Sequence, residues 1–293
     1  MRGYDWLVCG FLLGTLFLGA CRKTEAQSRS DAASGMASEN VNEVDSVNQS
    51  KSGAGNGGNV PSLSRARIAR ALKEAGTPAH LSANILEAAE NGSFADDLAA
   101  ATAGDPFLYL LVDKTHPLPP GYEPGDLVPL QNGAYRINRN DLSLRHEAEA
   151  SLAQMAEAAR AEGVTLVASS SYRSEAYQKE VYERNVRQSG QETADRESAR
   201  PGRSQHQTGL VIDFGSITDA FAETAAGKWL SQNASRFGWS LSFPDGYEQV
   251  TGYRWESWHY RYVGKTLAAF IDAYFGGIQQ YALEFLHAYT EGS

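Results

Sequence analysis

The stretch from residue 22 to residue 62 contains almost nothing that a folded core could bury, and it therefore limits where this chain can fold. It is rich in Ser, Asn, Gly and charged residues, and it includes the glycine-rich run from Gly53 to Asn59. Such a composition cannot offset the conformational entropy lost on folding, and Gly/Ser-rich segments behave as flexible linkers. We therefore expect residues 21–62 to form a flexible tether, with the folded part beginning near Leu63.

An apolar run from Leu7 to Ala20 precedes the tether. It follows Arg2 and is too short to cross a bilayer comfortably, which is typical of a secretory signal peptide. The segment from Leu18 to Cys21 also resembles the lipobox of bacterial lipoproteins, whose cysteine is acylated. We expect residues 1–20 to be a lipoprotein signal peptide and Cys21 to carry the lipid. The protein would then be extracytoplasmic, in the periplasm or at the cell surface, and anchored to the membrane.

Cysteine usage and charge exclude several kinds of chemistry. Both cysteines, Cys9 and Cys21, precede the tether, so the folded part has no disulfide, no cysteine metal ligand and no cysteine nucleophile. The formal net charge is -9 and no basic run is present, which argues against a nucleic-acid partner because phosphate binding relies on clustered Lys and Arg. No obligate protein partner is evident. Histidines, carboxylates and hydroxyls must carry the chemistry.

The pattern of apolar residues predicts an α+β fold. Helical spacing between residues 63 and 104 indicates two or three short helices as an appended segment. The main domain, residues 105–293, shows strand and helix patterns without strict βαβ alternation, which favours a mostly antiparallel sheet flanked by helices. We expect strands at 108–112, 164–169, 209–214, 239–243 and 253–263, and helices at 144–162, from Ser174, at 224–237 and at 265–289, with a polar loop at 191–203.

Two of the six histidines lie near other groups that could bind a metal. A catalytic zinc takes three protein ligands and leaves one position open, and His206, Asp213 and His259 are a complete set. Asp213 follows an apolar run, where an ionised carboxylate is costly unless it is paired or bound to a cation. The same position also suits an aspartate that caps a turn at a strand end. His206, taken alone, also suits an ordinary loop histidine.

Glu256 and Arg173 are further candidates. Glu256 lies three residues before His259, and a carboxylate beside zinc is the expected general base. On a flat strand that offset sends the two side chains to opposite faces, so a bend is required if both reach one metal. Arg173 follows a predicted strand and could stabilise an oxyanion. Each residue, taken alone, also suits an ordinary surface position.

Three separated motifs, taken together, resemble the VanY-type D-alanyl-D-alanine carboxypeptidases. They are Ser-x-His-x-x-Gly-x-x-x-Asp over residues 204–213, Tyr-Arg-Ser over 172–174 with Gln178 four residues on, and Glu-x-Trp-His-x-Arg-Tyr-Val-Gly over 256–264. Leu111 to Lys114 and the prolines that follow resemble the first segment of that family's domain. The resemblance covers about residues 108–264. Two positions depart from the family's pattern, since Val211 replaces a small residue and Ser257 replaces a proline.

The resemblance implies a fold shared with lysostaphin-type endopeptidases and the hedgehog zinc domain, with one Zn²⁺ per chain. The implied roles are zinc ligation for His206, Asp213 and His259, general base for Glu256, transition-state stabilisation for Arg173, and contacts to the peptide terminus for Ser204 and Gln178. The implied function is a zinc carboxypeptidase that removes the terminal D-alanine from peptidoglycan stem peptides.

Two alternatives remain open from the sequence. One is an L,D-carboxypeptidase that acts on tetrapeptide stems with the same metal site and a different pocket. The other is a non-catalytic wall-binding lipoprotein in which zinc is only structural. Loss of Glu256 or Arg173 would have favoured the second, and both residues are present.

Overall fold

The structure, a computed structural model, describes residues 64–291. The expected signal peptide, the lipidation site Cys21 and the tether lie outside these residues. Within residues 64–291, no helix is both long enough and apolar enough to span a membrane.

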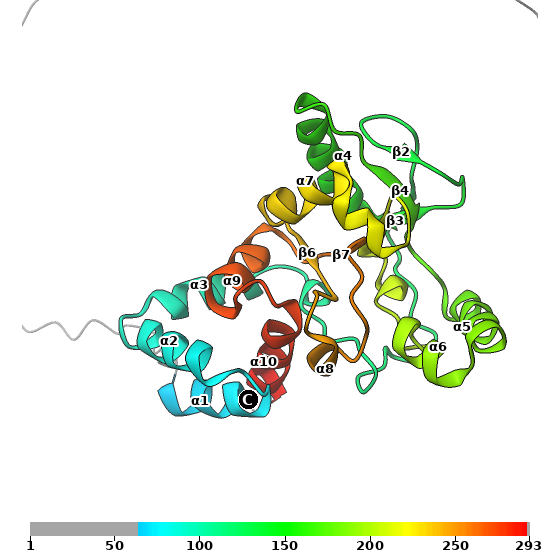
Figure 1. Ribbon diagram of the computed structural model, residues 1–293. Helices are drawn as coiled ribbons and strands as arrows, with labels where there is room; N and C mark the ends of the chain where they lie inside the picture. The colour runs from blue at the N-terminus through cyan, green and yellow to red at the C-terminus, as the bar shows by residue number, and fades with distance from the viewer. Residues whose placement is uncertain (1–63, 292–293) are drawn as a thin grey trace, which may run out of the picture. The chain divides into compact units, whose positions relative to one another are not determined.

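A five-stranded sheet lies between the groups of helices (Figure 1). Its strand order is β2-β4-β5-β7-β6, and every neighbouring pair is antiparallel except β2 with β4. The strands are β2 (Arg136–Ile137), β4 (Val167–Ser170), β5 (Val211–Phe214), β6 (Trp239–Leu241) and β7 (His259–Tyr262). Two further strands, β1 (Leu127–Pro129) and β3 (Ser143–Arg145), pair antiparallel in a separate sheet. The predicted α+β class with a mostly antiparallel sheet is confirmed.

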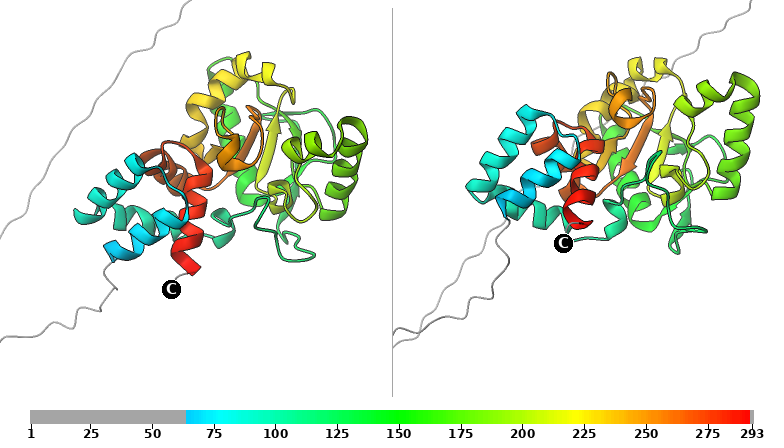
Figure 2. Two further views of the ribbon diagram at one scale, coloured as in Figure 1. Left: turned by 60° about the horizontal axis from the view of Figure 1, so that its bottom comes forward. Right: turned by 90° about the horizontal axis from the view of Figure 1, so that it is seen from below.

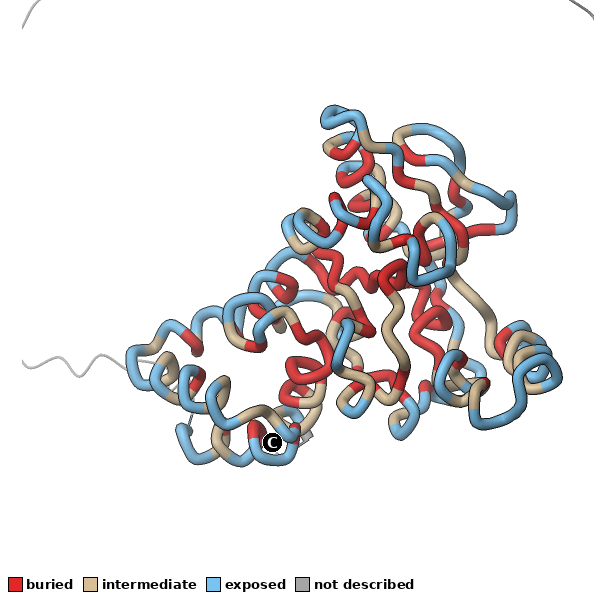
Figure 3. The backbone as a smooth tube through the Cα atoms, in the orientation of Figure 1, coloured by how far each residue is buried: buried red, intermediate tan, exposed pale blue. Residues whose placement is uncertain are grey.

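Helix α4 (His146–Ala161) packs one face against this sheet. Its buried residues recur three or four positions apart, as an amphipathic helix requires: Ala148, Ser151, Leu152, Met155, Ala156 and Ala159. They share a core with Ile212 and Phe214 of β5 and Tyr260 of β7. Figure 3 shows buried residues concentrated along the strands. This packing holds β5 and β7 in fixed register.

A second core joins the two ends of the described chain. It contains residues of α1 (Arg65–Glu74), α2 (Ala79–Glu90) and α3 (Ser93–Thr102) together with α9 (Lys265–Phe275) and α10 (Gln279–Glu291). Phe94 of α3 lies 5.4 Å from Phe270 and 5.7 Å from Phe285 between ring centroids. Figure 2 shows the N-terminal helices, in blue and cyan, beside the C-terminal helices in red. The appended helices therefore complete the environment of α9 and α10.

The strand predicted at residues 108–112 is wrong. A short 3-10 helix, η1 (Pro106–Leu108), occupies its start, with the Asp105 side chain accepting a hydrogen bond from the backbone N–H of Phe107 at 2.9 Å. The buried guanidinium of Arg261 donates to the carbonyls of Phe107, Leu108 and Leu110. These carbonyls are satisfied by a side chain, so the segment needs no partner strand.

Two helix predictions also change. The predicted helix at 265–289 is two helices, because Gly276 adopts φ +61° at the end of α9, a left-handed conformation that favours glycine. The predicted loop at 191–203 contains α6 (Gln191–Glu197), which Asp195 fastens to Tyr182 of α5 (Glu175–Ser189) through a 2.7 Å hydrogen bond. The remaining helices are η2 (Gln205–Thr208), η3 (Asp219–Glu223), α7 (Ala225–Asn233), η4 (Ala234–Phe237) and α8 (Glu248–Thr251).

Candidate metal centre

Strands β5 and β7 bring Asp213 and His259 face to face. The two residues are direct partners in the antiparallel register, and directly opposed residues on such strands project to the same side of the sheet. Both side chains are buried, and Asp213 Oδ1 lies 3.2 Å from His259 Nδ1. Strand pairing therefore joins two groups that are far apart in the sequence.

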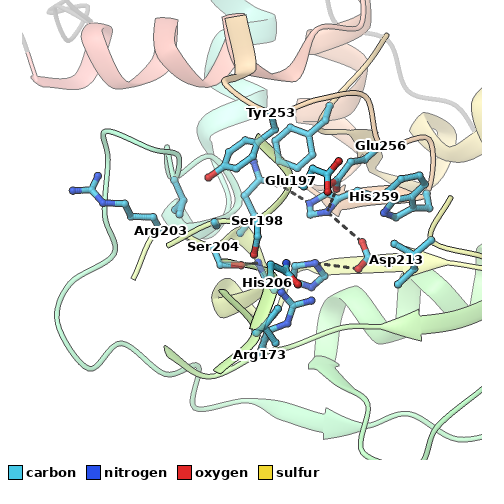
Figure 4. Close-up of a pocket in the computed structure, with 18 of the residues that line it drawn as sticks. Arg173, Glu197, Ser198, Arg203, Ser204, His206, Asp213, Tyr253, Glu256 and His259 are labelled. Atoms are coloured by element: carbon cyan, nitrogen blue, oxygen red, sulfur yellow. Dashed lines mark hydrogen bonds and ion pairs between the residues drawn. The ribbon is translucent and has the colours of Figure 1, made fainter. Parts of the chain in front are cut away.

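His206 reaches the same carboxylate from η2, which directly precedes β5. Its Nε2 lies 3.3 Å from Asp213 Oδ2. Gly209 makes the intervening turn with φ +69°, and a β-carbon there would lie 2.9 Å from Leu127 Cδ2 and 3.0 Å from Arg145 Cγ. Only glycine fits this crowded left-handed position. Figure 4 shows His206, Asp213 and His259 pointing toward one another.

Each imidazole directs one nitrogen to Asp213 and the other to an acceptor. His206 Nδ1 lies 2.7 Å from the Ser171 carbonyl oxygen, which can only accept, so the ring donates there and keeps Nε2 for a ligand. His259 Nε2 lies 3.3 Å from Gln205 Oε1, while its Nδ1 faces the carboxylates. The rings meet edge to face, with centroids 5.0 Å apart.

Glu256 joins the cluster through the bend that its spacing requires. Strand β7 begins only at His259, and a turn at Ser257 and Trp258 precedes it. The His259 backbone N–H donates to the Glu256 carbonyl at 3.2 Å, which closes the turn. Glu256 Oε2 consequently lies 3.3 Å from His259 Nδ1. Because this turn lies outside the sheet, the side chains of Glu256 and His259 can both face Asp213.

Burial and charge oppose each other in this cluster. Burial lowers the pKa of His206 to about 4, against the attraction of Asp213. Burial would raise the pKa of Asp213, but the two imidazoles outweigh it and the pKa falls. Burial would lower the pKa of His259, but Asp213 and Glu256 raise it to about 9. Burial raises the pKa of Glu256. Asp213 and Glu256 thus both face His259, the one imidazole whose pKa is raised. A site with two carboxylates around one imidazole suits a divalent cation.

The donor set fits zinc. His206, Asp213 and His259 each offer a ligand atom, and these atoms lie within 4.8 Å of one another. Asp213 Oδ1 is buried, and its neighbour His259 Nδ1 at 3.2 Å is a potential metal ligand rather than a hydrogen-bond donor of good geometry. Buried carboxylate oxygens usually have such a donor, so a bound cation would complete the surroundings of this one. Two imidazoles and one carboxylate are a ligand set typical of catalytic zinc.

Arg173 lies beside the cluster, and Gln178 lies behind Arg173. The Arg173 backbone N–H donates to the His206 carbonyl at 3.2 Å, and its Nη1 donates to Gln178 Oε1 at 2.7 Å. Gln178 is fully buried, and its Nε2 donates to the Ala199 carbonyl at 2.6 Å. Both ends of the amide are engaged within the protein. This arrangement holds the guanidinium, and it differs from the contact to a peptide terminus that the resemblance implied for Gln178.

A pocket of about 240 Å³ opens onto these groups. Its wall contains the expected site residues other than Gln178, namely Arg173, Ser204, His206, Asp213, Glu256 and His259. Ser204 is nearly buried there, and its Oγ accepts from the His206 backbone N–H at 3.3 Å. In Figure 4, Ser204 and Arg173 lie near His206, with Glu256 near His259.

Three pocket residues were not predicted from the sequence. Gln205 contacts His259, Phe243 packs against the His259 ring with centroids 4.6 Å apart, and Tyr253 places its buried hydroxyl in the pocket wall. The Tyr253 hydroxyl has no hydrogen-bond partner within the described part of the chain. Gln205 carried the clearest signal, because it lies between the predicted site residues Ser204 and His206.

Known proteins are similar to the part of the chain that contains these residues. The family model of VanY, described as D-alanyl-D-alanine carboxypeptidase, matches residues 141–265, which contain every predicted site residue except Cys21. Bacillus subtilis YodJ, named as a carboxypeptidase, is 40% identical over 169 residues, covering 55% of this chain and 62% of the relative. Enterococcus gallinarum VanXYC, a bifunctional D-Ala-D-Ala dipeptidase and carboxypeptidase, is 30% identical over 61% of this chain and 93% of its own length.

A solved structure extends the similarity to the fold. A VanY D,D-pentapeptidase variant from a vancomycin resistance cassette, in complex with Zn(II), aligns with a TM-score of 0.51 and 29% identity, covering 60% of this chain and 99% of that one. The chain spans 62% and 58% of the first two curated relatives that it matches. The match over nearly all of VanXYC, together with the ordered motifs, shows that this chain belongs to the VanY-type D-alanyl-D-alanine carboxypeptidase family.

Proposed function

We propose that this protein is a zinc-dependent D-alanyl-D-alanine carboxypeptidase that removes the terminal D-alanine from peptidoglycan stem peptides. The observation that carries the proposal is the buried convergence of two imidazoles and a carboxylate, with a second carboxylate 3.3 Å from a ligand nitrogen. The D-Ala-D-Ala carboxypeptidase activity of the family and of VanXYC supports the choice of substrate.

In this proposal, His206 Nε2, one oxygen of Asp213 and His259 Nδ1 hold the zinc ion. The unsatisfied oxygen of Asp213 supports this assignment, because a cation would complete its coordination. When bound, zinc supplies Lewis-acid chemistry, which lowers the pKa of a water molecule and polarises the scissile carbonyl.

Glu256 is the proposed general base. Burial raises the pKa of its carboxylate, which makes it a better proton acceptor than an exposed glutamate. It takes the proton from the attacking water and then delivers it to the amine of the departing D-alanine. A leaving amine without that proton departs poorly, so the same carboxyl group serves both steps.

Arg173 and Ser204 are the proposed contacts to the substrate. Arg173 carries a fixed positive charge on the pocket wall and would stabilise negative charge that develops on the carbonyl oxygen. Ser204 would donate its hydroxyl to the terminal carboxylate. Gln178 acts one step further back in this proposal, because its hydrogen bond at 2.7 Å orients the Arg173 guanidinium.

We also propose that the protein acts outside the cytoplasm and is held at the membrane by a lipid on Cys21. The D-alanyl-D-alanine carboxypeptidase activity of the family and of a relative supports an extracytoplasmic location, because the proposed substrate is part of peptidoglycan. The lipobox-like segment before Cys21 and the polar composition of residues 22–62 support the anchor and the tether. Incorporation of labelled fatty acid that disappears in Cys21→Ala would support it, and unchanged labelling would overturn it.

Digestion of defined stem peptides tests the catalytic proposal. The purified protein would be incubated with tri-, tetra- and pentapeptide stems, and the products identified by mass. Loss of one alanine from the pentapeptide alone is the expected result. Cleavage of the tetrapeptide instead would favour the L,D-carboxypeptidase, and zinc binding without cleavage of any stem would favour the structural-zinc alternative.

A further inference from the structure

The two histidines of the metal centre are held in orientation by different means. The acceptor for His206 is a backbone carbonyl, that of Ser171 at 2.7 Å. The acceptor for His259 is a side chain, since Gln205 Oε1 lies 3.3 Å from Nε2. The backbone acceptor would remain if Ser171 were replaced by another residue. The acceptor beside His259 would be lost if Gln205 were replaced by a residue without one.

A buried chain of polar groups fixes Gln205. The Ser242 hydroxyl donates to Gln205 Oε1 at 2.8 Å, so the amide oxygen of Gln205 faces both Ser242 and His259. Ser242 Oγ also lies 3.4 Å from Oε1 of Gln279, the first residue of α10, and Gln279 Nε2 donates to the Ser240 carbonyl at 3.2 Å. Gln205, Ser242 and Gln279 are all nearly inaccessible to solvent. This burial restricts the amide to one orientation.

The direction of the hydrogen bond decides which nitrogen of His259 is available. Because Gln205 Oε1 accepts, the His259 ring must carry its proton on Nε2. The lone pair is then on Nδ1, the nitrogen that lies 3.2 Å from Asp213 Oδ1 and 3.3 Å from Glu256 Oε2. The opposite tautomer would direct a proton at the ligand position and leave two acceptors facing each other.

We propose that Gln205 is a positioning residue that holds His259 in the tautomer and rotamer required for metal binding through Nδ1. This inference rests on the proposed zinc site. It adds Gln205, which would not contact the metal itself but would contact its ligand His259. Groups that accept a hydrogen bond from a ligating histidine typically change metal affinity by about 10- to 100-fold when they are removed.

The test is zinc affinity, measured on the full chain by competition with a chromophoric chelator. Gln205→Leu has a similar volume and no acceptor, so its zinc affinity should fall by roughly 10- to 100-fold. Gln205→Glu restores an acceptor and should bring the affinity back to the parent value or above it. A purely structural role would not give this rescue, because the charged variant disturbs packing at least as much as leucine.

Gln207→Leu is the matched control. Gln207 lies on the same short helix and is fully buried, but its Nε2 donates to the Tyr122 carbonyl at 2.9 Å. General loosening of η2 would weaken zinc binding in both leucine variants, and the proposal expects weakening only in Gln205→Leu. Ser242→Ala is a second route if Gln205→Leu does not fold, because it leaves Gln205 in place without its hydroxyl donor, and the affinity should fall less.

The outcomes separate the two proposals. A parent protein that binds no zinc overturns the proposed function and the positioning role together. Tight zinc binding by the parent, with Gln205→Leu unchanged or with an equal loss in Gln207→Leu, overturns only the positioning role. Selective loss in Gln205→Leu with rescue by Gln205→Glu supports it.

Discussion

Two clusters of histidine and carboxylate side chains lie within residues 64–291, and they are built from the same kinds of groups. The proposed metal centre comprises His206, Asp213 and His259, and the Asp113 cluster comprises Asp113, His116 and Glu284. In each cluster three candidate ligand atoms lie within 4.8 Å of one another. Composition and spacing alone therefore do not separate them.

The Asp113 cluster already contains the hydrogen-bond donors that its carboxylates need. Asp113 Oδ1 accepts from the backbone N–H groups of Thr115 and His116 at 2.7 and 2.9 Å, and from the Thr115 hydroxyl at 2.8 Å. The Gln280 amide donates to Asp113 Oδ2 at 2.9 Å and to Glu284 Oε1 at 3.0 Å. These N–H groups occupy the positions from which a cation would neutralise the two carboxylates.

The metal centre differs in its supply of donors. Among the described residues, no backbone N–H, hydroxyl or amide donates to Asp213 Oδ1, and the groups facing the carboxylate are imidazole nitrogens that can also bind metal. The contrast shows that the partners of a cluster, more than its residue types, indicate whether a cation belongs there. Measurements of metal content and of stability test this distinction.

The largest effect should be on zinc content. The purified chain should carry one zinc, and His259→Ala should lose it, because a three-ligand site that loses one ligand retains little chelate advantage. His116→Ala is the matched control from the Asp113 cluster and should keep the zinc. Elemental analysis after dialysis measures both. Retained zinc in His259→Ala, or zinc lost in His116→Ala, would reverse the assignment of the two clusters.

Glu256→Gln should separate binding from catalysis. The amide keeps the shape of the side chain but cannot accept the proton, so turnover of a D-Ala-D-Ala-terminated peptide should fall by roughly 10²- to 10⁴-fold with zinc retained. Glu197→Gln is the control, since Glu197 lines the same pocket but is exposed, with its Oε1 3.8 Å from Arg254 Nε. Near-normal turnover in Glu256→Gln would mean that another group is the base.

Arg173→Lys should slow turnover by a smaller factor. A compact ammonium cannot reproduce the guanidinium fork, and removal of one oxyanion donor typically costs about 10²- to 10³-fold in turnover. Zinc content should not change, because Arg173 is not a ligand. Arg187→Lys, on the exposed side of α5, should turn over normally. Equal rates in the two lysine variants would remove Arg173 from the proposed mechanism.

The residues proposed to bind zinc could be chosen from the sequence because they belong to short motifs, and the structure brings their ligand atoms within 4.8 Å of one another. His206 and Asp213 are joined by a glycine turn and a buried strand, and the Glu256 to His259 spacing already required a bend. Local pattern and resemblance were sufficient for these groups.

The parts that the sequence could not predict depend on tertiary contacts. The segment at 108–112 has a strand-like composition, but its carbonyls are satisfied by Arg261 from β7, and no local pattern reveals that contact. Gln178 lies in a family motif, yet its burial behind Arg173 follows from how α5 packs. Gln205 is an unspecified position inside the motif over residues 204–213, and its contact with His259 exists only once β7 and η2 are assembled.

The smallest predicted effect concerns Asp113 and measures what its hydrogen bonds contribute. Burial would raise the pKa of this carboxyl, but the donors from Thr115 and His116 outweigh burial and lower the pKa below its ordinary value of 3.8. The charged form therefore stabilises the folded state above about pH 4, and that contribution is lost as the pH falls through the lowered folded pKa. At pH 7, Asp113→Asn should reduce the free energy of unfolding by about 1–3 kcal/mol, while zinc content stays unchanged.

Urea unfolding of the zinc-loaded parent and variant between pH 7 and pH 3 tests this expectation. The difference in unfolding free energy should shrink below about pH 4, because the parent then also carries a neutral group at this position. Protonation of the zinc ligands affects both proteins equally and cancels in the difference. Asp245→Asn, at an exposed position, should change stability by less than about 0.5 kcal/mol. If Asp113→Asn also changes stability by less than about 0.5 kcal/mol, or if it releases zinc, then the hydrogen-bond donors of the Asp113 cluster do not take the place of a cation there.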